Sequence, residues 1–547
     1  MSTHPLKFCL VLLVFAFTLA ESNAVAQQPG PAANSLFRIA GLVVSTAGGA
    51  PLAQARVTIM NARNPKDVRS VLTAEDGRFE FSVGAGKYAL HGDKRGFIAA
   101  DYNQHEQFST AIVTGASLDT ENLILKLPHS AALTGKVLDE SGEPARQARV
   151  ILWRDDHSAG VSRIVRFRME TTDDRGAYEF IPLVPGTYFL SVSARPWYAV
   201  HPPSIVQEGT PLAAVDHSLD VVYPITFYAD ATESDDATPI PIRGGDHPDI
   251  EFRLIPIPAV HVLFHTDQKP ENGYQMPILQ KRIFDGADVQ DGMDSQVTSD
   301  GVFEIATAPG KYSVRLAGQR TASQVMEVDI NQDHQELSAS SGEALSSVSA
   351  SVHVLGEQTS PPQLFLMFRN PQGRTVAFGE VKAGGKAEFG EIAPGTYDLQ
   401  VGSPDGAFSI VRISSEGRDT PGHTLTVTAG SPLSLDLYLV GGSADVEGFA
   451  NQAGKPAAGA MIVLVPKHPD TNRERFRRDQ SDLDGSFSLR NVIPGTYTVT
   501  AIADGWDLDW SKPDVISAYA KHGQTMVVPA HSEHAVKLPE PVEVQPK

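Results

Sequence analysis

The sequence is short of cysteine, of positive charge and of long apolar segments, and each shortage narrows what the protein can be. Its 547 residues include one cysteine, Cys9, so neither disulfides nor cysteine-bound metals can stabilise its folds. Lysine and arginine total 45 against 65 aspartate and glutamate, which gives a net charge of −20. Because binding to nucleic acid needs a cationic surface, this balance argues against a nucleic-acid partner. Beyond residue 20, no apolar run approaches the roughly 18 residues that a transmembrane helix needs.

The first 26 residues have the pattern of a secretory signal peptide. An apolar run of 13 residues covers Phe8–Ala20, and Ala24-Val25-Ala26 supplies the small residues that signal peptidase accepts, with cleavage before Gln27. Cleavage after Ala20 and an uncleaved anchor are the alternatives. We therefore expect an exported protein in the periplasm, at the cell surface or outside the cell. Cleavage would remove Cys9 and leave no stable membrane insertion.

A motif recurs five times and sets the organisation of the chain. Each copy has a turn glycine, alternating apolar residues, and a tyrosine 11 or 12 residues after that glycine, usually within Pro-Gly-x-Tyr. The copies begin at Gly77, Gly176, Gly301, Gly385 and Gly485, and their tyrosines are Tyr88, Tyr188, Tyr312, Tyr397 and Tyr497. The spacing of 84 to 125 residues between copies is too long for a solenoid repeat and fits small independent domains.

The residues of each copy predict β-strands joined by turns. Asp-Gly favours a turn, and alternation such as Phe79 and Phe81 around a polar residue is typical of a half-buried strand. Upstream, three copies share a first strand that ends in a Gly-x-Pro turn and a second strand that begins at a small alanine; the shared motif starts at Gly41, Gly135 and Gly448. Further alternating segments close the units, so each has six or seven short strands, as a β-sandwich does. Helical patterns are scarce. We predict an all-β fold, a tandem array of about five prealbumin-like or immunoglobulin-like sandwiches.

The closing strands place the predicted domain limits. We expect a signal peptide at 1–26, a disordered leader at 27–34 and a frayed tail at 541–547. Unit two carries an extension, and units three and four keep only the second half of the motif. The five predicted units are unit one (35–128), unit two (129–258), unit three (259–340), unit four (341–441) and unit five (442–540).

These motifs together resemble the carboxypeptidase regulatory-like domain. The resemblance rests on the Gly-x-Val start, the Gly-x-Pro turn, Asp-Gly-x-Phe and Pro-Gly-x-Tyr, most clearly in units one, two and five. It implies a transthyretin-like or prealbumin-like seven-stranded sandwich, related to carbohydrate-binding-like folds, with a role that is usually non-catalytic. The extension of unit two resembles modules in exported proteins of acidobacterial type.

The sequence contains few motifs that are typical of catalytic or metal sites. His-x-x-Glu and His-Glu-x-x-His zinc motifs, a Gly-x-Ser-x-Gly elbow and glycine-rich phosphate loops are all missing from the sequence. Asp482-x-Asp484-Gly485 could pass for a calcium loop, but a turn explains the same residues. His531-Ser532-Glu533-His534 is a tight cluster that we interpret as a solvated loop. We predict no catalytic residue, no cofactor and no metal.

Aromatic residues near carboxylates are the remaining candidates for a binding site. Sugars stack on tryptophan and tyrosine, and carboxylates bind their hydroxyls. Two segments offer this combination, and we expect the side chains of Trp510 and Trp197 to be more available to a ligand than that of Trp506. The candidate binding residues are Trp197, Tyr198, Trp506, Asp507, Asp509 and Trp510. We therefore predict a non-catalytic exported binding or scaffold protein whose partner is a glycan. The alternatives are a structural spacer or protein-interaction protein of the envelope, and an accessory subunit of a separate hydrolase or transporter.

Overall fold

The computed structural model is built almost entirely from β-strands, which confirms the all-β prediction. Among the residues described, the one α-helix is α1 (Pro513–Ala520). We keep the unit names for the strands that fall within each predicted range. The structure describes residues 36–115, 118–202, 216–265, 277–289, 294–297, 302–316, 324–338, 343–355, 363–371, 375–404, 407–415, 417–420, 423–442, 444–529, 532 and 534–547.

Units one and two each pair a three-stranded sheet with a five-stranded sheet. The sheets are β4-β1-β8 and β3-β2-β5-β6 with β7 on β5 in unit one, and β12-β9-β17 and β11-β10-β13-β15 with β16 on β13 in unit two. Their strands are β1 (Phe37–Ser45), β2 (Arg56–Asn61), β3 (Asn64–Leu72), β4 (Arg78–Val83), β5 (Lys87–Asp93), β6 (Ala100–Asp101), β7 (Ile112–Val113), β8 (Leu123–Leu127), β9 (Ala131–Leu138), β10 (Arg149–Asp156), β11 (Arg163–Thr171), β12 (Ala177–Leu183), β13 (Gly186–Ser193), β14 (Val221–Val222), β15 (Thr226–Phe227), β16 (Ile240–Ile242), β17 (Asp249–Arg253) and β18 (Ile257–Pro258). Short 3-10 turns η1 (His217–Leu219) and η2 (Ser234–Asp236) lie in the extension of unit two.

Units three and four have larger sheets of four and five strands. The sheets are β22-β23-β19-β26 and β21-β20-β24-β25-β27, then β31-β28-β36-β33-β34 and β30-β29-β32-β35. Their strands are β19 (Val260–His265), β20 (Pro277–Ile283), β21 (Gly286–Val289), β22 (Asp294–Val297), β23 (Val302–Thr307), β24 (Gly310–Leu316), β25 (Gln324–Ile330), β26 (Gln335–Ser338), β27 (Glu343–Ala344), β28 (Ser346–Val354), β29 (Phe365–Arg369), β30 (Thr375–Glu380), β31 (Lys386–Ile392), β32 (Gly395–Gly402), β33 (Ala407–Ser415), β34 (Arg418–Thr420), β35 (Thr424–Val427) and β36 (Leu433–Gly442).

Unit five joins its strands into one nine-stranded sheet that includes the end of the chain. Its elements are β37 (Ala444–Gln452), β38 (Lys455–Pro456), β39 (Met461–Pro466), η5 (Arg473–Arg475), β40 (Arg477–Gln480), β41 (Ser486–Val492), β42 (Gly495–Ile502), η6 (Gly505–Asp507), α1, β43 (Gln524–Val528), β44 (Val536–Lys537) and β45 (Val542–Gln545). The frayed tail predicted for 541–547 is therefore wrong. Val542 and Val544 alternate with polar residues and are buried, and β45 pairs with β37 and β42.

All five units share one strand arrangement around their cores. The first strand pairs antiparallel with the strand that follows the turn glycine and parallel with the closing strand, as β1 does with β4 and β8. The same relation holds for β9, β19, β28 and β37. Alternating burial along β4 and β8 shows why these sequences form strands, because their apolar side chains face the core and their polar ones face water.

The motif tyrosine fastens the corner in every unit. Its ring is buried, and its hydroxyl donates a hydrogen bond to the carbonyl four residues upstream, at 2.6 Å for Tyr497 and Ile493. The other four pairs span 2.7–3.1 Å and are Tyr88–Gly84, Tyr188–Val184, Tyr312–Ala308 and Tyr397–Ala393. The Pro-Gly-x-Tyr spacing thus supplies both a turn and the hydrogen bond that holds it.

Removing one hydroxyl should loosen one unit. Tyr497→Phe leaves the buried carbonyl of Ile493 without its donor, so we expect unit five to lose about 1–2 kcal/mol of unfolding free energy. Thermal unfolding followed by calorimetry measures this loss. Tyr438→Phe is the control, because Tyr438 lies partly exposed on unit four, stacked on His353. Equal losses in both variants would contradict the role of the corner hydrogen bond.

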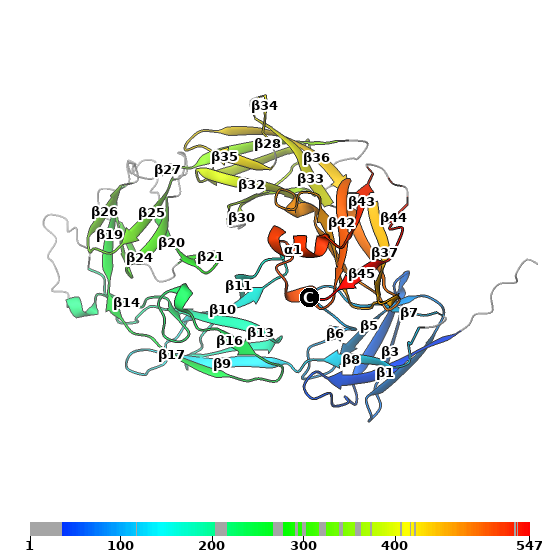
Figure 1. Ribbon diagram of the computed structural model, residues 1–547. Coiled ribbons are helices and arrows are strands. Elements are labelled where there is room, and N and C mark those ends of the chain that lie inside the picture. The colour runs from blue at the N-terminus through cyan, green and yellow to red at the C-terminus, as the bar shows by residue number, and fades with distance from the viewer. Residues whose placement is uncertain are drawn as a thin grey trace, which may run out of the picture.

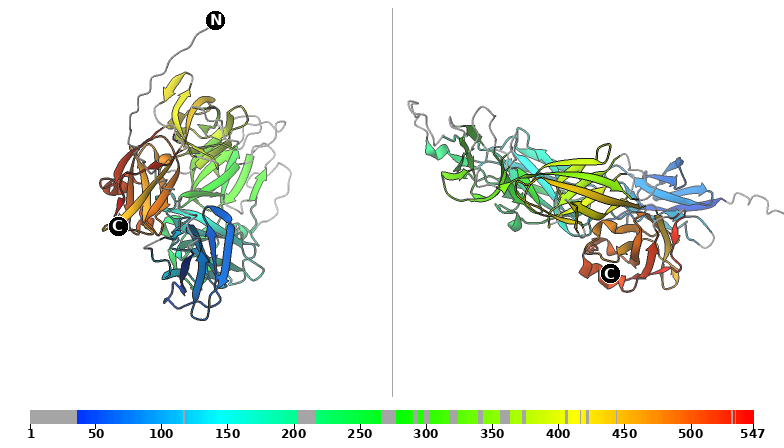
Figure 2. Two further views of the ribbon diagram at one scale, coloured as in Figure 1. Left: turned by 90° about the vertical axis from the view of Figure 1, so that its right-hand side faces the viewer. Right: turned by 90° about the horizontal axis from the view of Figure 1, so that it is seen from above.

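The five units are arranged in a ring that closes on itself (Figure 1), and the two further views show unit five beside unit one (Figure 2). Unit five meets unit one where Leu483 N–H donates to the Ala111 carbonyl at 3.0 Å and Ala111 N–H donates to Asp482 at 2.7 Å. Lys87 also pairs with Asp482. The turn that could pass for a calcium loop therefore uses its first carboxylate to bind unit one.

Candidate functional site

Trp197 and Tyr198 follow β13 and lie together on the surface of unit two. The Trp197 side chain is 82% exposed, the largest exposed fraction among the large hydrophobic residues that the structure describes. The Trp197 and Tyr198 rings meet edge to face, with centroids 5.8 Å apart. Because this indole is not packed inside the protein, a ligand can contact it without breaking internal packing contacts. Its position therefore suits a surface on which a ligand stacks.

A hollow of about 850 Å³ opens beside Trp197 and carries mixed charge. It is lined by Arg146, Gln147, Arg149, Thr172, Asp173, Asp174, Ser193, Ala194, Arg195 and Trp197. Three guanidinium groups lie beside the aromatic ring, and Nε of Arg149 already donates to Ser193 Oγ at 3.3 Å. A guanidinium can bind carboxylate oxygens bidentately while the ring covers an apolar face. The Asp173 carboxylate is already hydrogen-bonded within the protein, because it accepts the backbone N–H groups of Arg175 and Ala177. These bonds lower the pKa of Asp173.

The Tyr198 hydroxyl forms a hydrogen bond within unit two, beside the exposed Trp197 indole. The hydroxyls of Tyr198 and Tyr223 both donate to the carboxylate of Glu140, the second at 2.6 Å. Burial works to raise the pKa of Glu140, but these two hydrogen bonds overcome it and hold the pKa below its ordinary value. Burial and the bond to Glu140 raise the pKa of Tyr198 to about 12. This cluster fixes the backbone that presents Trp197.

The second predicted group lies inside an interface between units, and the expected exposure of Trp510 is wrong. Trp510 is buried beneath Gly160 of unit two and packs against Phe476 with ring centroids 5.6 Å apart. Trp506 stacks on His105 of unit one, with centroids 4.9 Å apart and ring planes within 5°. Trp506 and Trp510 both lie outside the strands, in η6 and in the segment before α1, where the local sequence does not indicate that another unit covers them.

The carboxylates of Asp507 and Asp509 in the same segment also form contacts within the protein. Asp509 accepts the backbone N–H of Ser162 at 2.8 Å and the Lys512 ammonium at 2.6 Å, and its pKa is lowered chiefly by Lys512. Asp507 pairs with Lys547 at 2.5 Å, which lowers its pKa. The Trp506–Trp510 segment thus joins units, and Trp197 with Tyr198 lies elsewhere, on unit two.

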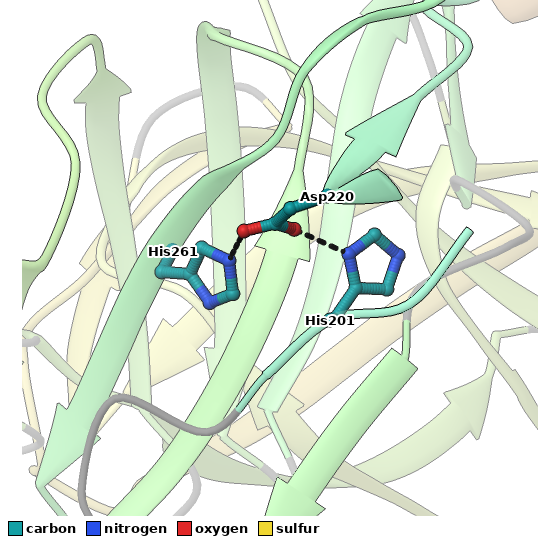
Figure 3. Close-up of side chains that lie close together, drawn as sticks. All are labelled: His201, Asp220 and His261. Carbon is teal, nitrogen blue, oxygen red and sulfur yellow. Dashed lines mark hydrogen bonds and ion pairs between the residues drawn. The ribbon is translucent and has the colours of Figure 1, made fainter. Parts of the chain in front are cut away.

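The structure also brings together a cluster that the sequence analysis missed. Asp220 lies between His201 and His261, with an oxygen 2.8 Å from a ring nitrogen of each (Figure 3). The other ring nitrogen of His261 lies 2.8 Å from Glu304. Burial works to lower the pKa of His261, but Glu304 and Asp220 overcome it and raise that pKa to about 9. No short-range spacing marks these residues, because they come from four separate segments. Of the earlier His531–His534 cluster, His531 and Glu533 lie outside the described residues.

Comparisons with known proteins agree with the first unit's motifs. Residues 38–114 match the family model of the carboxypeptidase regulatory-like domain. Unit one is a carboxypeptidase regulatory-like domain. Domains of this family are non-catalytic modules. A search of curated proteins finds no match.

The chain is similar to several solved structures at low sequence identity. They include the Bacillus anthracis TIE protein (11% identity, 75% of this chain and 75% of that chain, TM-score 0.17), a streptococcal ancillary pilin (8%, 53% and 100%, 0.20) and the shaft pilin SpaA from Lactobacillus rhamnosus GG (13%, 41% and 99%, 0.18). Among the described residues, no helix is long and apolar enough to cross a membrane.

Proposed function

We propose that this is an exported, non-catalytic protein that binds a carbohydrate through Trp197 on unit two. The observation that supports the proposal is the 82% exposed indole at the edge of a hollow with three arginines. Stacking of a sugar ring on an indole is tolerant of sugar type, while the arginines favour a sugar that bears carboxylates. Export rests on the predicted signal peptide, which lies outside the described residues.

A second candidate is a compact envelope scaffold, and a different observation favours it. Unit five contacts units one, two and four: Asp482 meets Lys87, Asp509 meets Ser162, and Glu474 accepts from Ser409 at 2.7 Å. An extended spacer would leave its first and last units apart. The closed ring therefore argues against a linear spacer and favours a rigid body that presents the face of unit two to an envelope glycan or protein.

The test is binding to a defined acidic polysaccharide. We expect the full mature chain to bind polygalacturonate more tightly than dextran, and Trp197→Ala to weaken that binding at least tenfold because the stacking surface is removed. Affinity electrophoresis or calorimetry measures both. Arg146→Gln should weaken binding to polygalacturonate and leave any binding to dextran unchanged.

The matched control is another exposed aromatic residue, one that belongs to unit four and does not line the hollow. Phe378 on unit four is 60% exposed, so Phe378→Ala removes comparable apolar surface without touching the hollow. Equal binding by wild type and Trp197→Ala, across a glycan array as well as polygalacturonate, would contradict the proposed carbohydrate site. That outcome, with envelope proteins recovered by cross-linking, would favour the scaffold.

A further inference from the structure

A buried histidine–aspartate–histidine cluster lies at the junction of units two and three. His201 follows the Trp197–Tyr198 pair, Asp220 lies between η1 and β14, and His261 is in β19 of unit three (Figure 3). One donor atom from each residue lies within 4.8 Å of the others. The His261 and His201 side chains are 4% and 6% exposed, and that of Asp220 is 15% exposed. Such a concentration of donor atoms away from water is uncommon without a function.

A carboxylate behind His261 completes the arrangement that metal-binding histidines use. Glu304 lies in β23, two residues from Ala306, which pairs with His261, and its Oε1 is 2.8 Å from Nδ1 of His261. This contact fixes the ring so that Nε2 points to Asp220. Histidine ligands of metals are held in the same way, because a carboxylate on one ring nitrogen orients the ring and makes the other nitrogen a better donor.

The kind of donor decides which ion the cluster could hold. Two imidazole nitrogens and one carboxylate oxygen suit zinc and similar late first-row divalent ions, whereas calcium and magnesium prefer sites built from oxygen alone. We propose that His201, Asp220 and His261 bind a zinc ion, with Glu304 positioning His261. The site would provide three protein ligands and leave one coordination position to water or to another group.

Small movements of the side chains make room for the ion. Zinc–ligand bonds of about 2.1 Å place neighbouring donors about 3.4 Å apart in a tetrahedral site. The contacts from Asp220 to the two histidines are 2.8 Å, so each histidine must move away from Asp220 by about half an ångström. On binding, zinc would displace one proton from Nδ1 of His201 and one from Nε2 of His261, and both protons would pass to solvent.

A zinc ion here would tie two units together. His201 and Asp220 belong to unit two, and His261 with Glu304 belongs to unit three. The strands nearest the cluster also meet, because β14 pairs with β18 and Val222 packs against Ala259, Ala306 and Ala308. Because the site exists only when both units are folded and docked, bound zinc must stabilise the junction.

The experiment uses the untagged mature chain, stripped with a chelator and then titrated with zinc. We expect one zinc ion per chain by calorimetry and by elemental analysis after dialysis, together with a higher melting temperature; calcium should produce neither. His201→Ala should weaken zinc binding at least tenfold, and Glu304→Gln about 10- to 100-fold, as is usual for residues that position a metal ligand.

His353→Ala is the matched control, because His353 lies against Asp436 as a partly exposed histidine–aspartate pair on unit four. It should bind zinc like the wild type. Circular dichroism of each chelated variant separates a lost ligand from a lost fold. Failure of the wild type to retain one zinc ion, or equal affinity in wild type and His201→Ala, would overturn the proposal and leave a hydrogen-bonded cluster. Neither result depends on whether Trp197 binds a carbohydrate.

Discussion

Replacing Arg478 with alanine is expected to release unit five from units one and two. The Arg478 side chain is 4% exposed, and its guanidinium forms two hydrogen bonds with Glu106 of unit one, at 2.7 and 3.1 Å. It also donates to the Ser158 carbonyl of unit two at 3.1 Å and lies 4.3 Å from the centre of the Trp510 ring. One side chain therefore joins three units.

The expected loss is large because the partner charge stays behind. The Glu106 side chain is 21% exposed, so removing the guanidinium leaves a partly buried carboxylate without its partner. We expect a cost between the roughly 1 kcal/mol of an exposed pair and the roughly 3–5 kcal/mol of a buried one. Small-angle scattering should show a larger radius of gyration as the ring opens, and calorimetry should show unit five unfolding separately. Arg478→Lys keeps the charge but loses the paired hydrogen bonds and the flat contact with Trp510, so it should recover only part of the coupling.

An exposed arginine provides the comparison for Arg478. Arg412 of unit four lies 3.6 Å from the centre of the Tyr438 ring and pairs with Asp419 at 3.8 Å, but its side chain is 47% exposed. Arg412→Ala should cost less than about 1 kcal/mol and leave the radius of gyration unchanged. A ring that stays closed in Arg478→Ala would show that the apolar contacts alone hold unit five in place.

Much of the fold could be predicted because its signals are local. Alternation such as Phe79–Glu80–Phe81 depends only on the two faces of a strand, and both phenylalanines are buried in the core of unit one. The turn glycines are equally local, since Gly77 and Gly485 have φ of +77° and +78°, a conformation that favours glycine. The recurrence of these signals in five copies predicted the tandem array.

The contacts between units could not be predicted in this way. The sequence from Met461 to Val465 is apolar without alternation, and both faces of β39 are buried: one in the core of unit five and one under Trp510 and α1. An unbroken apolar strand indicates that both faces are covered, but it does not say by what. The zinc-site candidates illustrate the same limit, because residues 201, 220, 261 and 304 meet only after two units dock.

Gly135→Ala is expected to unfold unit two, because this glycine allows two strands to pair. Gly135 begins the shared upstream motif and lies in β9, opposite Ile250 of the closing strand β17. A Cβ at this position would lie 1.8 Å from the Ile250 carbonyl oxygen and 2.5 Å from the Tyr178 hydroxyl. Tyr178 donates to that same carbonyl at 2.8 Å, so the added methyl would push against a hydrogen bond buried in the sheet.

The cost should exceed the 1–3 kcal/mol that is usual for overpacking, because the obstacle is backbone rather than a flexible side chain. We expect a loss above about 4 kcal/mol, enough to unfold a marginal domain, seen as a missing calorimetric transition and rapid proteolysis within 129–258. Gly448→Ala is the comparison, since there the new Cβ would meet only the side-chain ends of Phe487 and Leu538, at 2.6 and 2.8 Å. Because these side chains can shift, we expect a smaller loss of stability in Gly448→Ala than in Gly135→Ala. Gly84→Ala, with no atom within 4 Å of the new Cβ, should change nothing. If Gly135→Ala were as stable as Gly84→Ala, the proposal that the motif glycine is needed for the close approach of β9 and β17 would be wrong.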